Sequence, residues 1–254
     1  MILKIKLLVT LTALGISTAS AQMGKIDTDR PDQTETPVVT PKKWIQLEMG
    51  LNVQQNNKTS TEFLLPTLLS KYGLSKKIEL RLITTLNHFS TANGNYATGL
   101  EPVELGTKIA LTEEKKWMPK TSLLFHVAIP ILASKKLKAD KLVPNFRLSM
   151  QHTLSGTVGL GYNLGAEWNG FSNKAIWAYT FAPGFNLTEH WYSYIEAFGF
   201  IAKDEPAQHN IDGGIAYYIN PDTKIDISSG FGISKTSPNW YFAMGASIRF
   251  KADN

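Results

Sequence analysis

Short segments in which apolar and polar residues alternate recur along most of this chain. The segment 78–86 shows the pattern clearly: with a period of two, Leu80 and Leu82 fall on one face of an extended strand, and Glu79 and Arg81 fall on the other. The alternation predicts a β-strand with one apolar face and one charged face.

The same pattern predicts twelve strands. Pro66 interrupts the second of them, and the ninth has aromatic residues on both faces, so that only Glu196 indicates which of its faces is polar. The predicted strands are Trp44–Val53, Glu62–Leu74, Ile78–Leu86, Val103–Leu111, Thr121–Ile131, Asn145–Leu154, Val158–Trp168, Ala175–Phe185, Trp191–Ile201, Asn210–Ile219, Ile225–Ile233 and Trp240–Phe250.

The apolar faces of these strands have no predicted covering layer, because no helical pattern accompanies them. Lipid is the natural cover, and a sheet in lipid must close so that every backbone group is paired. We therefore predict an all-β fold, a closed antiparallel transmembrane β-barrel of about twelve strands with meander topology. Short turns are expected on the periplasmic side, and the short connections are 75–77, 155–157, 188–190 and 220–223. Longer loops are expected on the outer side, and the longer polar connections are 88–101 and 132–144.

The first residues have the pattern of an export signal. Lys4 and Lys6 precede the apolar run 7–16, and Ala19-Ser20-Ala21 has the small residues of a cleavage site. The run is too short to span a bilayer as a helix. We predict a signal peptide at 1–21, a periplasmic leader or plug segment at 22–43, and an outer-membrane β-barrel at 44–254.

The composition excludes several kinds of chemistry. The chain has no cysteine, which excludes disulfides and thiol catalysis. Its formal charge of +5 becomes +3 once Lys4 and Lys6 leave with the signal, and its basic residues are scattered among acids, so we expect no nucleic-acid partner. Neither a cofactor nor a metal is predicted, because no histidines and carboxylates have ligand spacing.

The expected partners are those of an outer-membrane protein. They are outer-membrane lipid, an unidentified small-molecule solute and the barrel-assembly machinery during insertion. Gly245, Ile248 and Phe250 have the glycine, apolar and aromatic spacing that this machinery reads on a closing strand.

The polar faces of the strands supply the candidate site. If they enclose a bore, the charged residues on them line the path of a solute, or they fill the bore as a network of ion pairs. The candidate lumen-lining residues are Glu48, Lys71, Glu79, Arg81, Glu104, Lys108, Arg147, Glu167, Glu196, Asp212, Asp226 and Arg249.

The leader 22–43 has two interpretations. Its prolines and its lack of alternation are typical of an extended tail. Alternatively, its acidic residues enter the mouth of the barrel, meet Arg81, Lys108 or Arg249, and form a plug or constriction. The plug candidates are Asp27, Asp29, Arg30, Asp32 and Glu35.

Several of these motifs together resemble a known family. They are the leader stretch 27–37, Trp44–Gly50, Lys71–Leu74, Ile78–Arg81, Glu104–Lys108 and Asp226–Gly232. The chain resembles, over nearly all of its mature length, the outer-membrane transporter-like family labelled "putative MetA pathway of phenol degradation". The resemblance implies a barrel that passes small, aromatic or hydrophobic molecules. From the residues alone, we predict that the protein is not an enzyme.

Two other functions remain open at this stage. A non-conducting structural or adhesive barrel would use outer loops such as 90–96 or 134–138. An outer-membrane hydrolase would need a serine, a histidine and an orienting polar group close together. The alternation of its strand predicts that His126 faces inward, but no serine has a sequence spacing that would place it beside His126.

Overall fold

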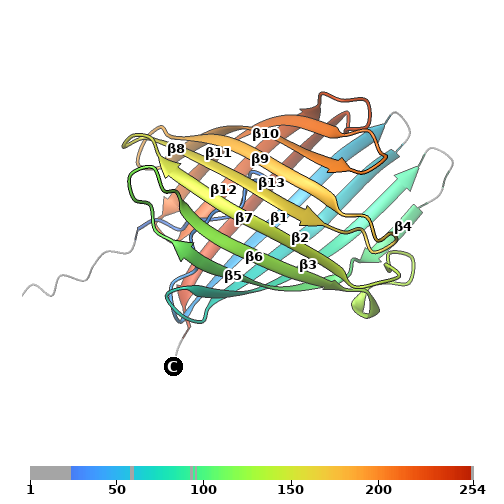
Figure 1. The fold of residues 1–254 in the computed structure, drawn as a ribbon, viewed down its shortest axis with the longest axis horizontal. Helices are drawn as coiled ribbons and strands as arrows, with labels where there is room; N and C mark the ends of the chain where they lie inside the picture. Colours follow the sequence, from blue (N-terminus) through green and yellow to red (C-terminus); the bar gives the residue numbers. More distant parts are fainter. Residues whose placement is uncertain (1–23, 58–59, 92–93, 95, 253–254) are drawn as a thin grey trace, which may run out of the picture.

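Thirteen β-strands form a single sheet in the computed structural model, which describes residues 24–57, 60–91, 94 and 96–252 (Figure 1). The predicted signal peptide, 1–21, lies outside the described residues. The strands are β1 (Trp44–Asn57), β2 (Ser60–Gly73), β3 (Ile78–Thr91), β4 (Tyr96–Leu100), β5 (Val103–Thr112), β6 (Lys120–Ile129), β7 (Val143–Thr153), β8 (Val158–Glu167), β9 (Ile176–Asn186), β10 (Trp191–Ala202), β11 (Gln208–Asn220), β12 (Thr223–Gly232) and β13 (Trp240–Lys251).

The sheet closes on itself. Neighbouring strands pair antiparallel in meander order, and β13 pairs with β1 along its length, from Trp44 opposite Lys251 to Gln55 opposite Trp240. The predicted closed antiparallel barrel is therefore confirmed. Every strand except the short β4 pairs with strands on both sides, as a sheet in an apolar solvent requires.

Strand β4 corrects one prediction. The connection 88–101 was expected to be a polar outer loop, but β3 continues to Thr91 and β4 pairs with its upper half, Leu86 opposite Leu100. Strand β5 pairs with the lower half of β3, so β4 and β5 together occupy one position and the barrel has twelve positions. Pro102 separates them because proline has no N–H for the ladder.

The end of the fifth predicted strand also differs from the prediction. The strand predicted to reach Ile131 ends at Ile129, and Pro130–Leu132 form a short 3-10 helix. The backbone of Ser134 then pairs with Leu100, so that one candidate adhesive loop, 134–138, begins against the edge of β4. Within the described residues, no helix is long and apolar enough to cross a membrane.

Side chains alternate across the wall, as β12 shows. On β12, Ile225 and Ile227 are exposed on the outside, whereas Lys224 and Asp226 are buried on the inside. The pattern reverses that of a soluble protein, in which large apolar side chains leave water. The ninth predicted strand follows the same rule, because Glu196 of β10 is buried inside and Ile195 is exposed.

Residues 24–43 run through the interior of the barrel without forming a strand; we call this segment the leader. It enters beside the β11–β12 turn, where the Ile26 N–H bonds the Pro221 carbonyl at 2.7 Å. It leaves beside β2, where the Lys43 N–H bonds the Gly73 carbonyl at 2.7 Å. The end of the barrel at which these contacts lie also carries the short connections, and we call it the turn end; the opposite one is the loop end.

Candidate functional site

The leader crosses the bore in contact with most of the wall. From the β11–β12 turn it reaches β8 to β10 at Gln33, Thr34 and Glu35, and it returns past β6 and β3. On the return, Ser122 of β6 donates to the Pro37 carbonyl at 2.5 Å, and Glu79 of β3 accepts from the Thr40 N–H at 2.6 Å and its hydroxyl at 2.7 Å. These contacts fix the leader at several points.

Asp29 is the centre of the largest ion-pair cluster. Its carboxylate lies 2.9 Å from the Lys108 ammonium and 2.9 Å from the Arg81 guanidinium, and it also pairs with Lys71. Glu48 accepts from the Asp29 N–H at 3.0 Å and pairs with Lys71 at 2.5 Å. Burial alone would raise the pKa of Asp29, but the three cations hold that pKa well below its usual range.

Glu35 is the second carboxylate that the leader presents to the same cations. Both of its oxygens accept from the Arg81 guanidinium, at 2.9 and 3.2 Å, which is a bidentate pair. The Glu35 backbone is held from the other side, because its N–H donates to Asn163 at 2.7 Å and its carbonyl accepts from Asn163 at 3.0 Å. Arg81 thereby joins Asp29, Glu35 and its neighbour Glu79.

Arg30 faces the wall where β12, β13 and β1 meet. Its guanidinium pairs with Asp226 of β12 at 2.9 Å and lies over Gly50 and Gly245, which stand opposite each other where β1 and β13 close the barrel. A Cβ at either glycine would overlap this guanidinium. The two glycines therefore make room for Arg30 at the closing pair of strands.

The acidic side of the bore receives hydrogen-bond donors from the leader. Glu196 of β10 accepts from the Gln33 N–H at 2.7 Å and from the Thr34 hydroxyl at 2.6 Å. Its cross-strand neighbour Asp212 of β11 accepts from the Tyr241 hydroxyl. Like charges that stand opposite each other destabilise a sheet, and these donors offset the repulsion.

Two cavities lie on either side of the turn that the leader makes at 32–35. One, of about 210 Å³, is lined by leader residues together with the inner wall of β7 to β12. The other, also about 210 Å³, is lined by Glu104, His126, Asn145 and Arg147. Asp32 and Glu35 line both cavities, so this turn separates them.

A family model supplies the evolutionary context. The model described as "Putative MetA-pathway of phenol degradation" matches residues 28–250, which includes the leader from Thr28 onward and all thirteen strands except the last residue of β13. The chain belongs to this family. No curated protein sequence matches the chain.

Solved structures with this fold are outer-membrane proteins. An outer membrane channel from Pseudomonas putida F1 is 9% identical, with a TM-score of 0.69 over 89% of this chain and 100% of that one. The KdgM porin is 8% identical, with a TM-score of 0.56 over 81% of this chain and 99% of that one. The NanC porin is 10% identical, with a TM-score of 0.55 over 80% of this chain and 98% of that one. Identities this low show a shared fold.

In this family member, the charged residues predicted for the bore fall into two sectors. One sector on β1 to β5 contains the cations that meet Asp29 and Glu35, and one on β10 to β12 contains the acids that meet Arg30, Gln33 and Thr34. The first holds Glu48, Lys71, Glu79, Arg81 and Lys108, and the second holds Glu196, Asp212 and Asp226.

The remaining four predicted residues lie apart from both sectors. Arg147 and Glu167 pair with each other at 3.5 Å, and Arg147 also donates to the Gln33 carbonyl at 3.0 Å. Glu104 lines the second cavity. Arg249 was expected to meet a leader carboxylate, but it instead donates to the Gly24 carbonyl at 2.7 Å and pairs with Asp222.

Among the plug candidates, Asp29, Arg30 and Glu35 form ion pairs with the wall, whereas Asp27 and Asp32 line the first cavity. The candidate set did not include Lys224, which donates to the Thr28 hydroxyl and to the Arg30 carbonyl at 2.6 Å. Extending the alternation of β12 by two residues from Asp226 would have found it. The neutral contacts Ser122 and Asn163 carry no comparable signal, because uncharged inward residues occur on every strand.

Proposed function

We propose that this protein is an outer-membrane channel for small molecules and that its leader is a plug held in the bore. Location in the outer membrane is supported by the exposed apolar outer face, by the closed barrel and by the signal-like sequence at the start of the chain. The channel function is supported by the family assignment and by a charged interior that has cavities on both sides of the leader.

The observation that carries the proposal is the way in which the leader closes the bore. Asp29 and Glu35 neutralise cations that three different strands direct inward, namely Lys71, Arg81 and Lys108. Glu48 and Glu79 of the wall pair with Lys71 and Arg81, but within the described residues Lys108 forms ion pairs only with Asp29 and Glu35 of the leader. Supplying the acids from a separate segment allows the bore to open when that segment moves.

The names of similar proteins support a small solute. The Pseudomonas putida F1 protein is named an outer membrane channel, and NanC and KdgM are named porins. The family description refers to phenol degradation, which favours solutes as small as single-ring aromatic compounds.

We further propose that the protein is not an enzyme. A hydrolytic histidine needs a free nitrogen beside a serine hydroxyl. The Nε2 atom of His126 instead lies 2.9 Å from Nε of Arg81, which donates to it. A structural or adhesive role is the second candidate, and it is favoured by the completeness with which the leader fills the centre of the bore.

Conductance of a leader deletion separates these candidates. We expect low single-channel conductance for the mature chain in planar bilayers, and a severalfold increase when residues 27–41 are deleted. A matched control replaces the exposed Lys135, Lys136 and Lys138 with serine, and we expect it to conduct like the unaltered chain. Liposome swelling with sugars, amino acids and small aromatics would then rank the solutes.

Two outcomes would contradict the proposal. If neither the mature chain nor the deletion variant conducts although both fold as barrels, the protein is a structural barrel. If both conduct equally, the leader is not a plug. Folding of each variant is checked by heat-dependent gel mobility and by the circular dichroism of β-structure.

A further inference from the structure

The rim of the barrel at the turn end is basic over one half of its circumference. This half runs from β13 through β1, β2, β3 and β5 to β6, which follow one another around the barrel. Its connections and strand ends carry eight lysines and only two acids, Glu113 and Glu114. The lysines are the pairs at 42–43, 76–77 and 115–116, together with Lys120 and Lys251. We call this surface the basic rim.

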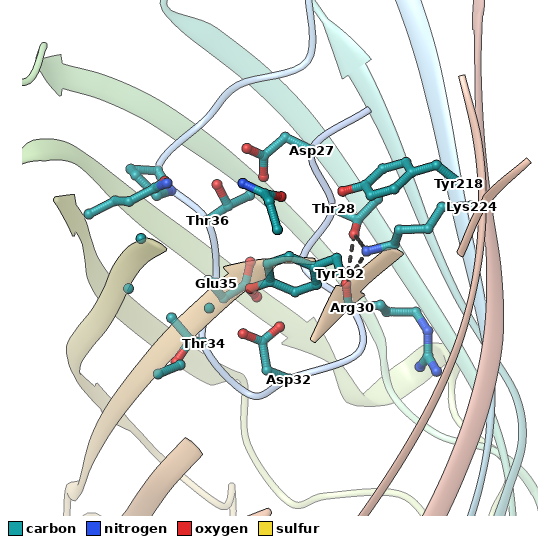
Figure 2. A pocket seen from close by; sticks show the side chains of 17 residues that line it. Asp27, Thr28, Arg30, Asp32, Thr34, Glu35, Thr36, Tyr192, Tyr218 and Lys224 are labelled. Atoms are coloured by element: carbon teal, nitrogen blue, oxygen red, sulfur yellow. Dashed lines mark hydrogen bonds between the residues drawn. The ribbon is translucent and has the colours of Figure 1, made fainter. Parts of the chain in front are cut away.

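The other half of the same rim, from β7 to β12, has a different composition. Its connections 154–157, 187–190 and 220–223 contain no lysine or arginine. Lys224 follows the last of them, but it points into the bore, where its ammonium bonds the Thr28 hydroxyl (Figure 2). Lys25 of the leader is the other cation at this half, and its ammonium contacts the Glu189 carbonyl and the Tyr218 ring. The excess of exposed lysine is therefore confined to the basic rim.

Backbone contacts join the basic rim into one surface. The Ala252 N–H bonds the Lys43 carbonyl at 2.8 Å, and the Lys43 N–H bonds the Gly73 carbonyl at 2.7 Å. On the other side of the β2–β3 turn, the Lys77 carbonyl accepts from the Ala110 N–H of β5 at 2.8 Å. Neighbouring connections are two strand spacings, or about 10 Å, apart. Because this is about one Debye length at 0.1 M salt, the charges act together.

Most of these charges have no counterion in the protein. Glu113 pairs with Lys120 at 3.3 Å, and Glu114 accepts from the Thr153 N–H of β7 at 2.7 Å. Like charges repel, so an anion from outside the chain would stabilise this surface. Within the described residues, no ion pair or side-chain hydrogen bond is formed by the exposed Lys42, Lys76, Lys77, Lys115, Lys116 and Lys251.

The apolar outer face of the barrel ends at the same lysines. Leu74 precedes the first pair on the β2–β3 turn, and Leu111 of β5 precedes the second; both are exposed. Trp117, directly after Lys116, is 83% exposed. Tryptophan and lysine at the edge of an apolar band are typical of the headgroup level of a membrane. A soluble acidic partner would account for the charges but not for this border.

We propose that the basic rim binds the headgroups of anionic phospholipids, whose acyl chains lie against the outer face of β1 to β6. The phosphates would lie between the lysine pairs of neighbouring connections. A headgroup that also carries an ammonium, as in phosphatidylethanolamine, would be repelled by the lysines, whereas phosphatidylglycerol would not. The site is on the outside of the barrel, so lipid binding does not depend on whether the leader opens the bore.

Native mass spectrometry of the detergent-purified mature chain tests the proposal. The chain is mixed with equal amounts of phosphatidylglycerol and phosphatidylethanolamine that have the same acyl chains. We expect at least about fivefold more bound phosphatidylglycerol, the factor that corresponds to one lysine near an anionic lipid surface. Raising the salt should reduce this preference, because the lysines are exposed.

Substitutions test the role of the charges. Lys76→Gln, Lys77→Gln, Lys115→Gln and Lys116→Gln, made together, remove four charges and should lower the preference about fivefold or more. The matched control replaces the same four lysines with arginine, which keeps the charges and should keep the preference. The four side chains have no ion pair within the described residues, so both variants are expected to fold, and heat-dependent gel mobility checks that they do.

Cross-linking then locates the bound lipid. Phosphatidylglycerol with a photoreactive headgroup, added to the reconstituted chain, should label peptides that contain 74–77 and 113–119 more than those that contain 154–157 and 187–190. Equal labelling of the two halves would overturn the proposal, and so would equal binding by the glutamine and arginine variants. Equal binding of the two phospholipids would also overturn it and would favour an acidic soluble partner. The plug is tested separately, by conductance.

Discussion

The two sectors of the bore hold the leader by opposite chemistry. On β2, β3 and β5, the wall has cations, and Asp29 and Glu35 of the leader form ion pairs with them. On β10 to β12, the wall has acids, and the leader binds them with Arg30, the Gln33 N–H and the Thr34 hydroxyl. The order of charges in the leader therefore matches the arrangement of charges around the wall. A tail that entered the bore without specific contacts would not show this match.

This difference also predicts which of the two sectors binds the leader more strongly. The first sector contains several buried charges that each have more than one partner, and removing one partner from a buried pair costs about 3–5 kcal/mol. The second relies on one ion pair, on neutral donors and on space left by two glycines. We therefore expect changes in the first sector to release the leader most.

The largest effect is expected for Asp29→Asn, which leaves Lys71, Arg81 and Lys108 sharing fewer negative charges. Because the chain has no cysteine, Val39→Cys introduces one reporter into the leader. Labelling of that cysteine by a maleimide in detergent should become more than about tenfold faster in the Asp29→Asn background.

Glu113→Gln and Asp140→Asn provide a control, since both carboxylates are exposed in connections outside the bore. Their labelling rates should equal that of the reporter alone. If Asp29→Asn does not change the rate at which the cysteine is labelled, the first sector does not hold the leader more strongly than the second.

A smaller effect is expected for Gly245→Val, which places a side chain where Arg30 lies. The end of a long arginine can move, so only the pair with Asp226 is lost and labelling should accelerate severalfold. Gly156→Ala is the matched control, because nothing lies within 4 Å of the position its Cβ would take. If both substitutions change the labelling rate equally, the absence of a side chain at Gly245 is not needed to accommodate Arg30.

A still smaller effect is expected for Thr34→Val, which keeps the shape and removes the hydroxyl that bonds Glu196 and Thr180. The loss of a buried hydrogen-bond donor costs about 1–3 kcal/mol. Thermal unfolding should shift to lower temperature for Thr34→Val and much less for Thr34→Ser, which retains the hydroxyl. An equal shift for both would assign the effect to packing.

The smallest effect is a dependence on pH. With the leader in place, the pKa of Asp32 is about 8, whereas a free aspartate titrates near 3.8. The docked leader therefore binds a proton that the released leader does not, and docking weakens as pH rises toward 8 and is constant above it. Open probability in bilayers should rise between pH 6 and 8 and stay constant above that range.

The groups that face Asp32 are Lys224, Asp212, Asp29 and Glu196, together with the phenols of Tyr192, Tyr194, Tyr218 and Tyr241. Asp32→Asn should abolish the rise in open probability. A rise that persists in this variant would assign the titration to another of these groups.

The fold was largely predictable because a period of two is a local signal. It identified the strands at all twelve barrel positions and placed Lys71 and Glu196 on the polar face, where both are buried. It missed β4, because Tyr96–Leu100 is short and follows the sequence Asn93-Gly94-Asn95. It also missed Lys224, because the strand was predicted to begin one residue later.

The path of the leader was only partly predictable. The acids of the leader were expected to meet Arg81 or Lys108, and Asp29 and Glu35 contact both. Which acid meets which cation depends on contacts between residues far apart in the sequence, such as Thr34 with Thr180 and Arg30 with Asp226. No local pattern encodes such distances, and the same holds for the fit of Arg30 over Gly50 and Gly245.

The central claim is that the leader lies in the bore at one defined register, and a cysteine pair tests it most directly. The Thr34 and Thr180 hydroxyl oxygens are 2.6 Å apart. In cells carrying Thr34→Cys and Thr180→Cys, we predict a disulfide that forms without added oxidant, and none when Thr34→Cys is combined with Thr85→Cys on the opposite wall. Failure of the first pair to form, or equal formation in both, would contradict the account.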